Sequence, residues 1–235
     1  MKNTLPPRVE QNLESQIRVS TRLKTLAASH PTGPVPFVTL SRQFGCEAIA
    51  LADVLAVKLD ETEKLDQGSW QVYSRKLIEA MADEQYSYDQ LMSALDSKAR
   101  GAIEEFVESL LGRISDLRLL HKLVHTMRAT ATLGRCVIVG RGGAMMTRDM
   151  AGGIHVRLVA SEEFRLKRLI ERYDWSELTA LTRMREEDNH RRSFYQKYLH
   201  RDASDPELYD LVLNAERMTR DEMAGQIFTL FRARR

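Results

Sequence analysis

Residues 37–50 read FVTLSRQFGCEAIA and pass from an apolar run, through a short polar loop, into a stretch with helical spacing. The apolar run covers 37–40, and we expect the helix over residues 46–59. A short, continuous apolar run is typical of a strand that is buried on both faces. The loop at 41–46 therefore follows the carboxyl end of a buried strand, where parallel α/β sheets bind their ligands.

Three further apolar runs follow, at residues 136–139, 155–159 and 209–213. Helical patterns separate them, over 76–133 and 162–201, and a last helix runs towards the C-terminus. Ser161 and Thr219 are predicted N-caps, because acidic residues occupy the first turn after each. Strands that alternate with helices predict a three-layer α/β fold, in which helices cover both faces of a parallel sheet.

The segment ahead of this pattern has a different composition. Residues 8–29 carry apolar side chains at close to helical spacing, and residues 30–36 hold three prolines, which stop a helix. We expect residues 1–36 to form an amphipathic helix with a stiff linker, and residues 37–235 to form the main domain. The apolar face of that helix needs a partner, either the main domain or a second copy in a homodimer.

Composition excludes several classes of protein. The 235 residues carry a formal net charge of only +2, which does not suggest a nucleic-acid binder. No apolar stretch reaches the ~20 residues that span a bilayer, and residues 1–15 do not resemble a secretory signal. His121 and His125 have metal-ligand spacing but no third ligand, so no metal site is predicted. A cytoplasmic protein is expected.

Two loops at the predicted sheet edge each carry an arginine. Arg42 lies in the loop at 41–46, and Arg141 lies in the Gly-Arg-Gly-Gly loop at 140–143. Two cations at one edge repel each other unless an anion lies between them, and the guanidinium fork suits a phosphate. The alternatives are an ordinary strand-to-helix connection and a glycine turn with a solvated arginine.

Residues 183–195 form a charged run with four arginines and interposed acids. Such a run is typical of a solvent-exposed helix laced by ion pairs. It also fits a mobile lid that lowers arginines onto a phosphoryl group and excludes water. Both interpretations stay open, and the interposed acids speak against a third, nucleic-acid binding.

In this order the motifs resemble those of the cytidylate kinase-like branch of the P-loop nucleoside monophosphate kinases. The resemblance begins at Phe37 and extends nearly to the C-terminus. The matching stretches are VTLSRQFG at 38–45, YSRKLI at 73–78, VIVGRG at 137–142, Asp188 with Arg191, Arg192 and Tyr195, and DPELYDLVLN at 205–214.

The resemblance implies a five-stranded parallel sheet, a helical acceptor-binding region over 71–133 and a lid over 183–201. It also implies transfer of the γ-phosphoryl group of ATP, with Mg²⁺, to a nucleoside monophosphate, CMP being the namesake acceptor. A nucleotide or another phosphorylated small molecule is thus the expected partner.

Site residues follow from the same resemblance. The donor phosphates would lie against Ser41, Arg42, Gln43, Phe44, Gly45 and Cys46. The acceptor would be bound by Tyr73, Arg75, Gly140, Arg141, Gly142 and Asp188. Charge on the transferred group would be stabilised by Arg42, Arg185, Arg191 and Arg192.

The chain departs from the family pattern directly after Cys46. Where the branch has glycines followed by Arg-Glu, this sequence has Glu47, Ala48, Ile49 and Ala50, and it contains no Gly-Lys dipeptide. Glycines let successive N–H groups curl around an anion, and a glutamate in their place repels phosphate. The second hypothesis is therefore a catalytically degenerate kinase-like module that binds a nucleotide or a protein.

Overall fold

The computed structural model describes residues 35–61, 69–83, 85–111 and 118–234, so the helix predicted over 8–29 lies outside the described residues. The chain divides into two compact units. One combines Pro36–Ser74 with Gly134–Arg235, and the other contains Arg75–Leu133.

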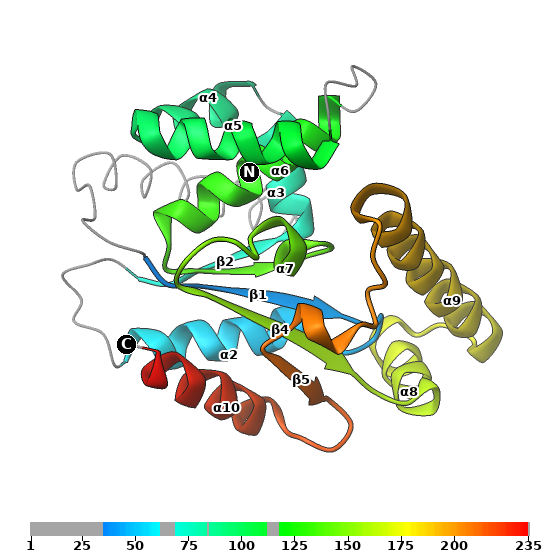
Figure 1. The fold of residues 1–235 in the computed structure, drawn as a ribbon. Helices are drawn as coiled ribbons and strands as arrows, with labels where there is room; N and C mark the ends of the chain where they lie inside the picture. Colours follow the sequence, from blue (N-terminus) through cyan, green and yellow to red (C-terminus); the bar gives the residue numbers. More distant parts are fainter. Residues whose placement is uncertain (1–34, 62–68, 84, 112–117, 235) are drawn as a thin grey trace, which may run out of the picture. The chain divides into compact units, whose positions relative to one another are not determined.

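The first unit is built on a five-stranded parallel sheet (Figure 1). The strands are β1 Phe37–Arg42, β2 Gln71–Ser74, β3 Cys136–Val139, β4 Gly153–Val159 and β5 Leu211–Asn214, in the order β2-β3-β1-β4-β5. Central strand β1 pairs Phe37 with Cys136 on one side and with Gly153 on the other. The carboxyl ends of β1, β3 and β4 therefore meet at one edge, as the sequence predicted.

The side chains of β1 alternate between two covered faces. Val38 and Leu40 pack in a core cluster with α2 (Ala48–Asp60) and α10 (Arg220–Ala233). Thr39 points to the opposite face, where a Cβ on Gly143 at the start of α7 (Gly143–Met146) would lie 3.1 Å from its Cβ. The fold is the predicted three-layer α/β arrangement, with α2 and α10 side by side on one face.

Helices α8 (Glu162–Tyr173) and α9 (Glu177–Phe194) pack against each other beyond β4. Their shared cluster contains Leu169, Ala180 and Met184. The helix predicted over 162–201 is broken at Asp174, which takes a left-handed backbone with φ 51°, and α9 restarts at the N-cap Ser176. A π-helix (Tyr195–Leu199) and a 3₁₀ turn (Pro206–Leu208) then lead to β5.

The second unit consists of four helices in its described part: α3 Arg75–Asp83, α4 Gln85–Ser93, α5 Ser97–Leu111 and α6 Arg118–Leu133. Helix α6 packs against the other three. Of the two α6 histidines that have metal-ligand spacing, His125 is buried at 7% exposure, and its Nδ1 lies 2.9 Å from Tyr88 Oη. Burial lowers the pKa of His125, which favours the neutral ring.

Capping residues were predicted well and some strand boundaries were not. The N-caps Ser161 and Thr219 are confirmed, the latter in a complete capping box with Glu222. Strand β5 begins at Leu211 rather than Tyr209, because Tyr209 closes the preceding 3₁₀ turn. Among the described residues, no helix is both long and apolar enough to cross a membrane.

Candidate functional site

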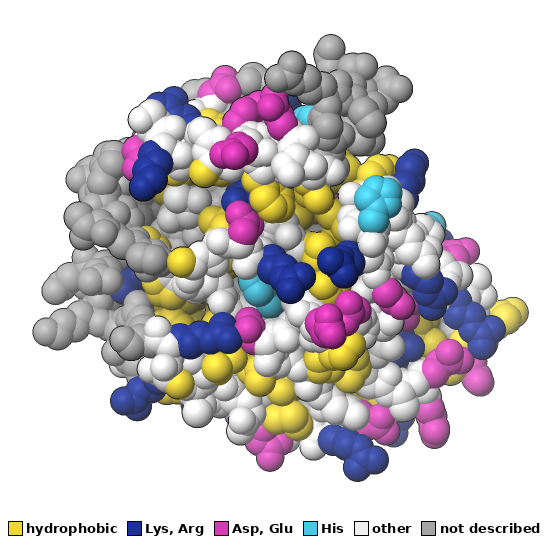
Figure 2. Space-filling view, viewed as in Figure 1, with side chains coloured by type: hydrophobic (Ala, Val, Ile, Leu, Met, Phe, Trp, Pro, Cys, Tyr) yellow, Lys and Arg dark blue, Asp and Glu magenta, His cyan; other side chains and the backbone are white. Residues whose placement is uncertain are grey.

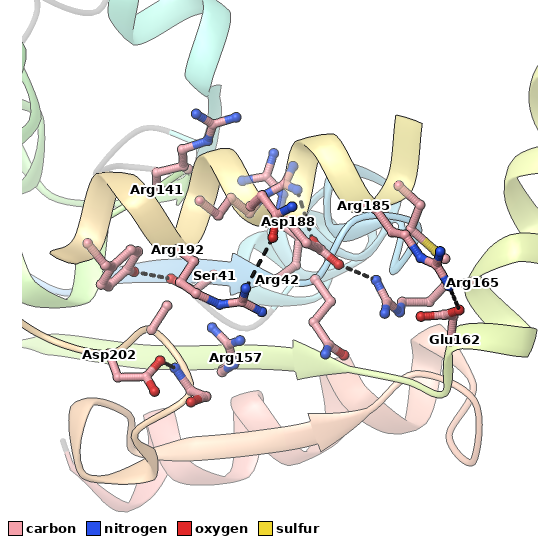
Figure 3. A pocket seen from close by; sticks show the side chains of 18 residues that line it. Ser41, Arg42, Arg141, Arg157, Glu162, Arg165, Arg185, Asp188, Arg192 and Asp202 are labelled. Carbon is pink, nitrogen blue, oxygen red and sulfur yellow. Dashed lines mark hydrogen bonds and ion pairs between the residues drawn. The ribbon is translucent and has the colours of Figure 1, made fainter. Parts of the chain in front are cut away.

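A cavity of about 500 Å³ opens at the edge where β1, β3 and β4 end (Figure 3). Its walls come from the loops after β1 and β3, from β4, from α8 and α9, and from the segment at 202–204. We call it the arginine pocket. It is lined by Ser41, Arg42, Gln43, Gly140, Arg141, Arg157, Glu162, Arg165, Met184, Arg185, Asp188, Asn189, Arg191, Arg192, Tyr195, Asp202, Ala203 and Ser204.

Cations outnumber anions on the walls of this pocket. Seven of the lining residues are arginines and three carry carboxylates. Arg42 and Arg141 reach it from two strand ends, so the convergence that the sequence predicted is observed. Figure 3 shows Arg192 on α9 and Arg157 on β4 pointing into the same space. Such a set of like charges favours an anionic ligand.

Asp188 fastens α9 to the loop at 41–46. Its Oδ2 accepts from Arg165 Nη1 at 2.5 Å, and its Oδ1 accepts from Arg191 Nη1 at 3.2 Å and from the Phe44 N–H at 2.9 Å. The Arg165 side chain is only 8% exposed, so this ion pair is nearly buried. The carboxylate that was predicted to bind an acceptor is thus engaged by protein donors.

The α9 arginines lie partly on the surface and partly at the pocket. Arg183 pairs on the surface with Glu186, whereas Arg185, Arg191 and Arg192 line the pocket. Figure 2 shows side chains of both signs interleaved over α8 and α9. The pocket arginines also have neighbours of their own, since Arg185 Nη2 lies 3.2 Å from Glu162 Oε1 and Arg192 Nη1 donates to Asn189 Oδ1 at 3.1 Å.

The backbone amides of the loop at 41–46 are largely bonded within the protein. The Gln43 N–H donates to the Leu158 carbonyl at 3.1 Å, the Cys46 N–H to the Gln43 carbonyl at 3.4 Å, and the Phe44 N–H to Asp188. The loop therefore does not present the row of amides that a phosphate cradle requires. Cys46 is 4% exposed, and burial raises the pKa of its thiol to about 11, so it stays protonated.

Glu47 occupies a backbone position that favours glycine. Its φ is 48°, and a left-handed backbone costs a non-glycine residue about 1 kcal/mol. Its carboxylate meets two arginines, Arg172 Nη1 at 3.3 Å from α8 and Arg220 Nη2 at 2.6 Å from α10. Burial by itself would raise the pKa of Glu47, but the hydrogen bond from Arg220 and the surrounding arginine charges outweigh it and lower that pKa.

A second cavity of about 140 Å³ lies on the α2 side of the loop. We call it the small cavity. Its walls include Arg42, Glu47, Ile49, Arg168, Arg172 and Arg191. It shares Arg42, Gln43 and Arg191 with the arginine pocket, so the two cavities adjoin. Ile49 is 37% exposed at the position where the family motif has its basic residue.

The residues present do not fit a resident Mg²⁺ ion. Mg²⁺ that arrives with a nucleotide is held mainly by phosphates and waters, whereas a resident ion needs several protein ligands. No group of three or more His, Cys, Asp or Glu suited to a metal occurs among the described residues. The three carboxylates of the arginine pocket have other partners. Asp188 binds two arginines, Glu162 pairs with Arg185, and Asp202 accepts the Ser204 N–H at 2.8 Å.

Three predicted acceptor residues have other surroundings. Tyr73 is 4% exposed on β2, and Arg75 belongs to the second unit, where its Nε contacts Glu79 Oε1 at 2.6 Å. The Gly142 N–H donates to the Tyr195 hydroxyl at 3.1 Å. With φ 75°, and with the Phe194 and Met146 side chains within 3.1 Å of where a Cβ would be, Gly142 is required by packing.

Sequence reasoning missed several residues that line the arginine pocket: Arg157, Glu162, Arg165, Tyr195, Asp202 and Ser204. Arg157 is a charged residue inside an apolar run, and this could have identified it as a residue of the site. Tyr195 appeared in the motif comparison but received no role. Its hydroxyl lies 3.3 Å from Ser41 Oγ and accepts the Gly142 N–H, so it joins the carboxyl ends of β1 and β3.

The fold is shared with a solved structure. A crystal structure of an uncharacterized protein from Eubacterium ventriosum matches with a TM-score of 0.66 at 19% identity, over 86% of this chain and 99% of that chain. Shikimate kinase from Bacteroides thetaiotaomicron matches with a TM-score of 0.45 at 11% identity, over 84% and 98%. Identities this low say nothing of substrate. Curated proteins provide no match to this chain.

A family model gives a more specific result. The model described as the cytidylate kinase-like family matches residues 37–217, which include β1 to β5 and every residue that lines the two cavities. The matched range contains each motif on which the resemblance was based. The chain therefore belongs to the cytidylate kinase-like family.

Proposed function

We propose that this protein binds the phosphate group of a nucleoside monophosphate, of the CMP type, in the arginine pocket. The observation that carries the proposal is the gathering of seven arginines around one cavity at the ends of three parallel strands. The volume of about 500 Å³ lies within the roughly 300–1,000 Å³ of small-molecule pockets. Membership of the cytidylate kinase-like family supports a nucleotide as the ligand class.

The existing ion pairs do not prevent binding. A guanidinium carries five N–H donors, so one arginine can hold a carboxylate and a phosphate together. Arg141, for example, donates from Nη2 to Glu187 Oε2 at 2.9 Å while its side chain lines the pocket. The carboxylates keep the arginines in place before the ligand arrives, and the phosphate then adds further charge-assisted hydrogen bonds.

Phosphoryl transfer from ATP is proposed to be very slow. The loop after β1 has lost the basic residue and glycines of the family motif, and its amides are largely bonded within the protein. One missing charge-stabilising donor costs about 10²–10³ in kcat. From a typical kcat of ~10 s⁻¹, this predicts less than about 0.1 s⁻¹.

Titration calorimetry with CMP and with cytidine tests the binding proposal. CMP should bind at least tenfold more tightly than cytidine, with an affinity that falls as salt rises. Arg192→Ala should weaken CMP binding, and Arg183→Ala is the matched control, since it lies on the same helix but outside the pocket. Equal affinities for CMP and cytidine, or equal effects of the two variants, would overturn the proposal.

Phosphoryl transfer is the second candidate function, and one observation favours it. The two cavities share Arg42 and Arg191, which is an arrangement suited to a donor on one side and an acceptor on the other. The test is release of labelled CDP from γ-labelled ATP and CMP with Mg²⁺. A kcat above about 0.1 s⁻¹ would establish an active kinase, and a lower value supports the binding function alone.

A further inference from the structure

The small cavity already contains an anion, the carboxylate of Glu47. Glu47 contacts Arg172 and Arg220 through its two oxygens. Arg172 lines the cavity together with Arg42, Arg168 and Arg191, whereas Arg220 approaches Glu47 from outside it. The Glu47 side chain is only 19% exposed, so its charge is largely withdrawn from water. Removing that charge would take the carboxylate partner from Arg172, next to Arg168 in the wall of the same cavity.

The backbone of α2 adds to this arrangement. Glu47 is the N-cap residue of α2, yet its side chain makes no capping hydrogen bond. The N–H groups in the first turn of a helix have no partner within the helix. Ala48 and Ile49, which belong to that turn, line the small cavity. The carboxylate therefore pairs with Arg172 and Arg220 instead of capping the first turn of α2.

We infer that the Glu47 carboxylate is a built-in occupant of an anion site, and that the small cavity binds inorganic pyrophosphate once this charge is removed. The volume of about 140 Å³ suits a small inorganic anion and is below the roughly 300 Å³ of pockets that hold a whole small molecule. The inference rests on the proposed function only in taking phosphate as the ligand. It explains why donor phosphates should bind weakly next to the loop after β1, because the chain itself supplies an anion there.

Pyrophosphate titration of the full chain, without metal ions and at constant ionic strength, tests the inference. Glu47→Gln keeps the size of the side chain and removes its charge, and it should bind pyrophosphate at least tenfold more tightly than the wild type. Glu171→Gln is the matched control, because it removes one negative charge from α8, next to Arg172 but outside both cavities. Its affinity should stay within twofold of the wild type.

A second substitution locates the site. Arg168 lines the small cavity but not the arginine pocket, so Arg168→Ala in the Glu47→Gln background should abolish the gain. Glu47→Gly provides an independent opening variant, because glycine tolerates the φ of 48° and folding is not put at risk. It should show the same gain.

Two outcomes would overturn the inference. One is a gain in Glu47→Gln and Glu47→Gly no greater than in Glu171→Gln, and the other is a gain that survives Arg168→Ala. Failure of the proposed function is a separate result, since it is measured by CMP binding to the wild type and by Arg192→Ala. The pyrophosphate gain and its loss in Arg168→Ala depend on neither.

Discussion

The two adjoining cavities share some of their residues, but they differ in how closely their sequence follows the family pattern. The arginine pocket draws its charge from β1, β3, β4, α8 and α9, and the family stretch VIVGRG at 137–142 is intact. The small cavity takes most of its wall from residues 42–49 and the rest from α8 and α9, and residues 47–50 depart from the family pattern. A pocket whose arginines come from many segments keeps most of its charge when the sequence of one segment changes. A phosphate cradle made by the amides of consecutive residues is lost by the same change.

Each cavity also has its own internal carboxylate. Asp188 ties α9 to the loop after β1, and Glu47 ties α8 and α10 to the start of α2. The two differ in the burial of the arginine they hold. Arg165, the partner of Asp188, is 8% exposed, whereas Arg172 and Arg220 are 50% and 46% exposed. Asp188 should therefore contribute more to stability, and Glu47 more to what the site binds.

The largest expected effect is the loss of stability in Asp188→Ala. The substitution removes the anion that pairs with the buried Arg165 guanidinium, which keeps the Phe44 carbonyl as an acceptor, and it removes the acceptor of the Phe44 N–H. It should lower the free energy of unfolding by about 3 kcal/mol. Urea denaturation measures it. Asp188→Asn keeps an oxygen for the Phe44 N–H and should lose less.

The matched control for Asp188 is Glu186→Ala on the same helix. Glu186 is half exposed and pairs with the exposed Arg183, so its loss should cost about 0.5 kcal/mol or less. If the two variants unfold at the same urea concentration, Asp188 does not hold the loop and the contrast between the two carboxylates is wrong.

Arg42→Ala should weaken ligand binding at both cavities, because Arg42 lines both. Losing one charge-assisted hydrogen bond costs about 2 kcal/mol, or roughly thirtyfold in affinity. Calorimetry should show that loss for CMP in the wild-type background and for pyrophosphate in the Glu47→Gln background. Arg192→Ala should affect CMP alone and Arg168→Ala pyrophosphate alone. An Arg42→Ala effect confined to one ligand would show that the cavities do not share this residue.

A smaller effect is expected from restoring a cation to the α2 side. Ile49 is 37% exposed in the first turn of α2, so Ile49→Lys places an ammonium group there with little loss of buried apolar area. The helix dipole opposes a cation at this end. The net gain in ATP affinity should be about 1 kcal/mol, roughly fivefold, in a fluorescence competition assay. Ile49→Met is the uncharged control, and an equal gain in that variant would rule out the charge as its cause.

Local sequence signals predicted the strands of the sheet and the N-caps of the helices. Val38 and Leu40 stand in a continuous apolar run, and Thr219 and Glu222 form a capping box whose two halves are three residues apart. Strand β2 carried too weak a signal, since its four residues QVYS are short and half polar. The start of β5 also escaped prediction, because Asp210 binds the His155 N–H just before the strand begins.

From the residues alone, the site could be predicted where strand ends determine it, whereas the pocket residues Arg185, Arg191 and Arg192 of α9 were expected from the family resemblance. Arg42 and Arg141 follow buried parallel strands, and the ends of such strands meet at one edge. Arg165 lies on a helix, and its place in the pocket depends on how α8 packs against α9. The partners of Glu47 are harder still to predict from sequence, because Arg172 and Arg220 lie 125 and 173 residues away along the chain. No local pattern predicts a contact of that separation.

The smallest expected effect is a dependence of stability on pH that originates at Glu47. The arginines lower the pKa of Glu47 in the folded protein, so its ion pairs contribute stability that is complete above the ordinary value of 4.5 and is lost as pH falls through the lowered one. Because Arg172 and Arg220 are half exposed, solvent screening limits the contribution to about 0.5 kcal/mol. The measurement is the difference in free energy of unfolding between the wild type and Glu47→Gln at pH 7 and at pH 3. Other carboxylates titrate in both proteins and cancel in that difference. It should shrink towards the acid end, and a difference that stays constant or grows would mean that Arg172 and Arg220 do not hold the ionised carboxylate.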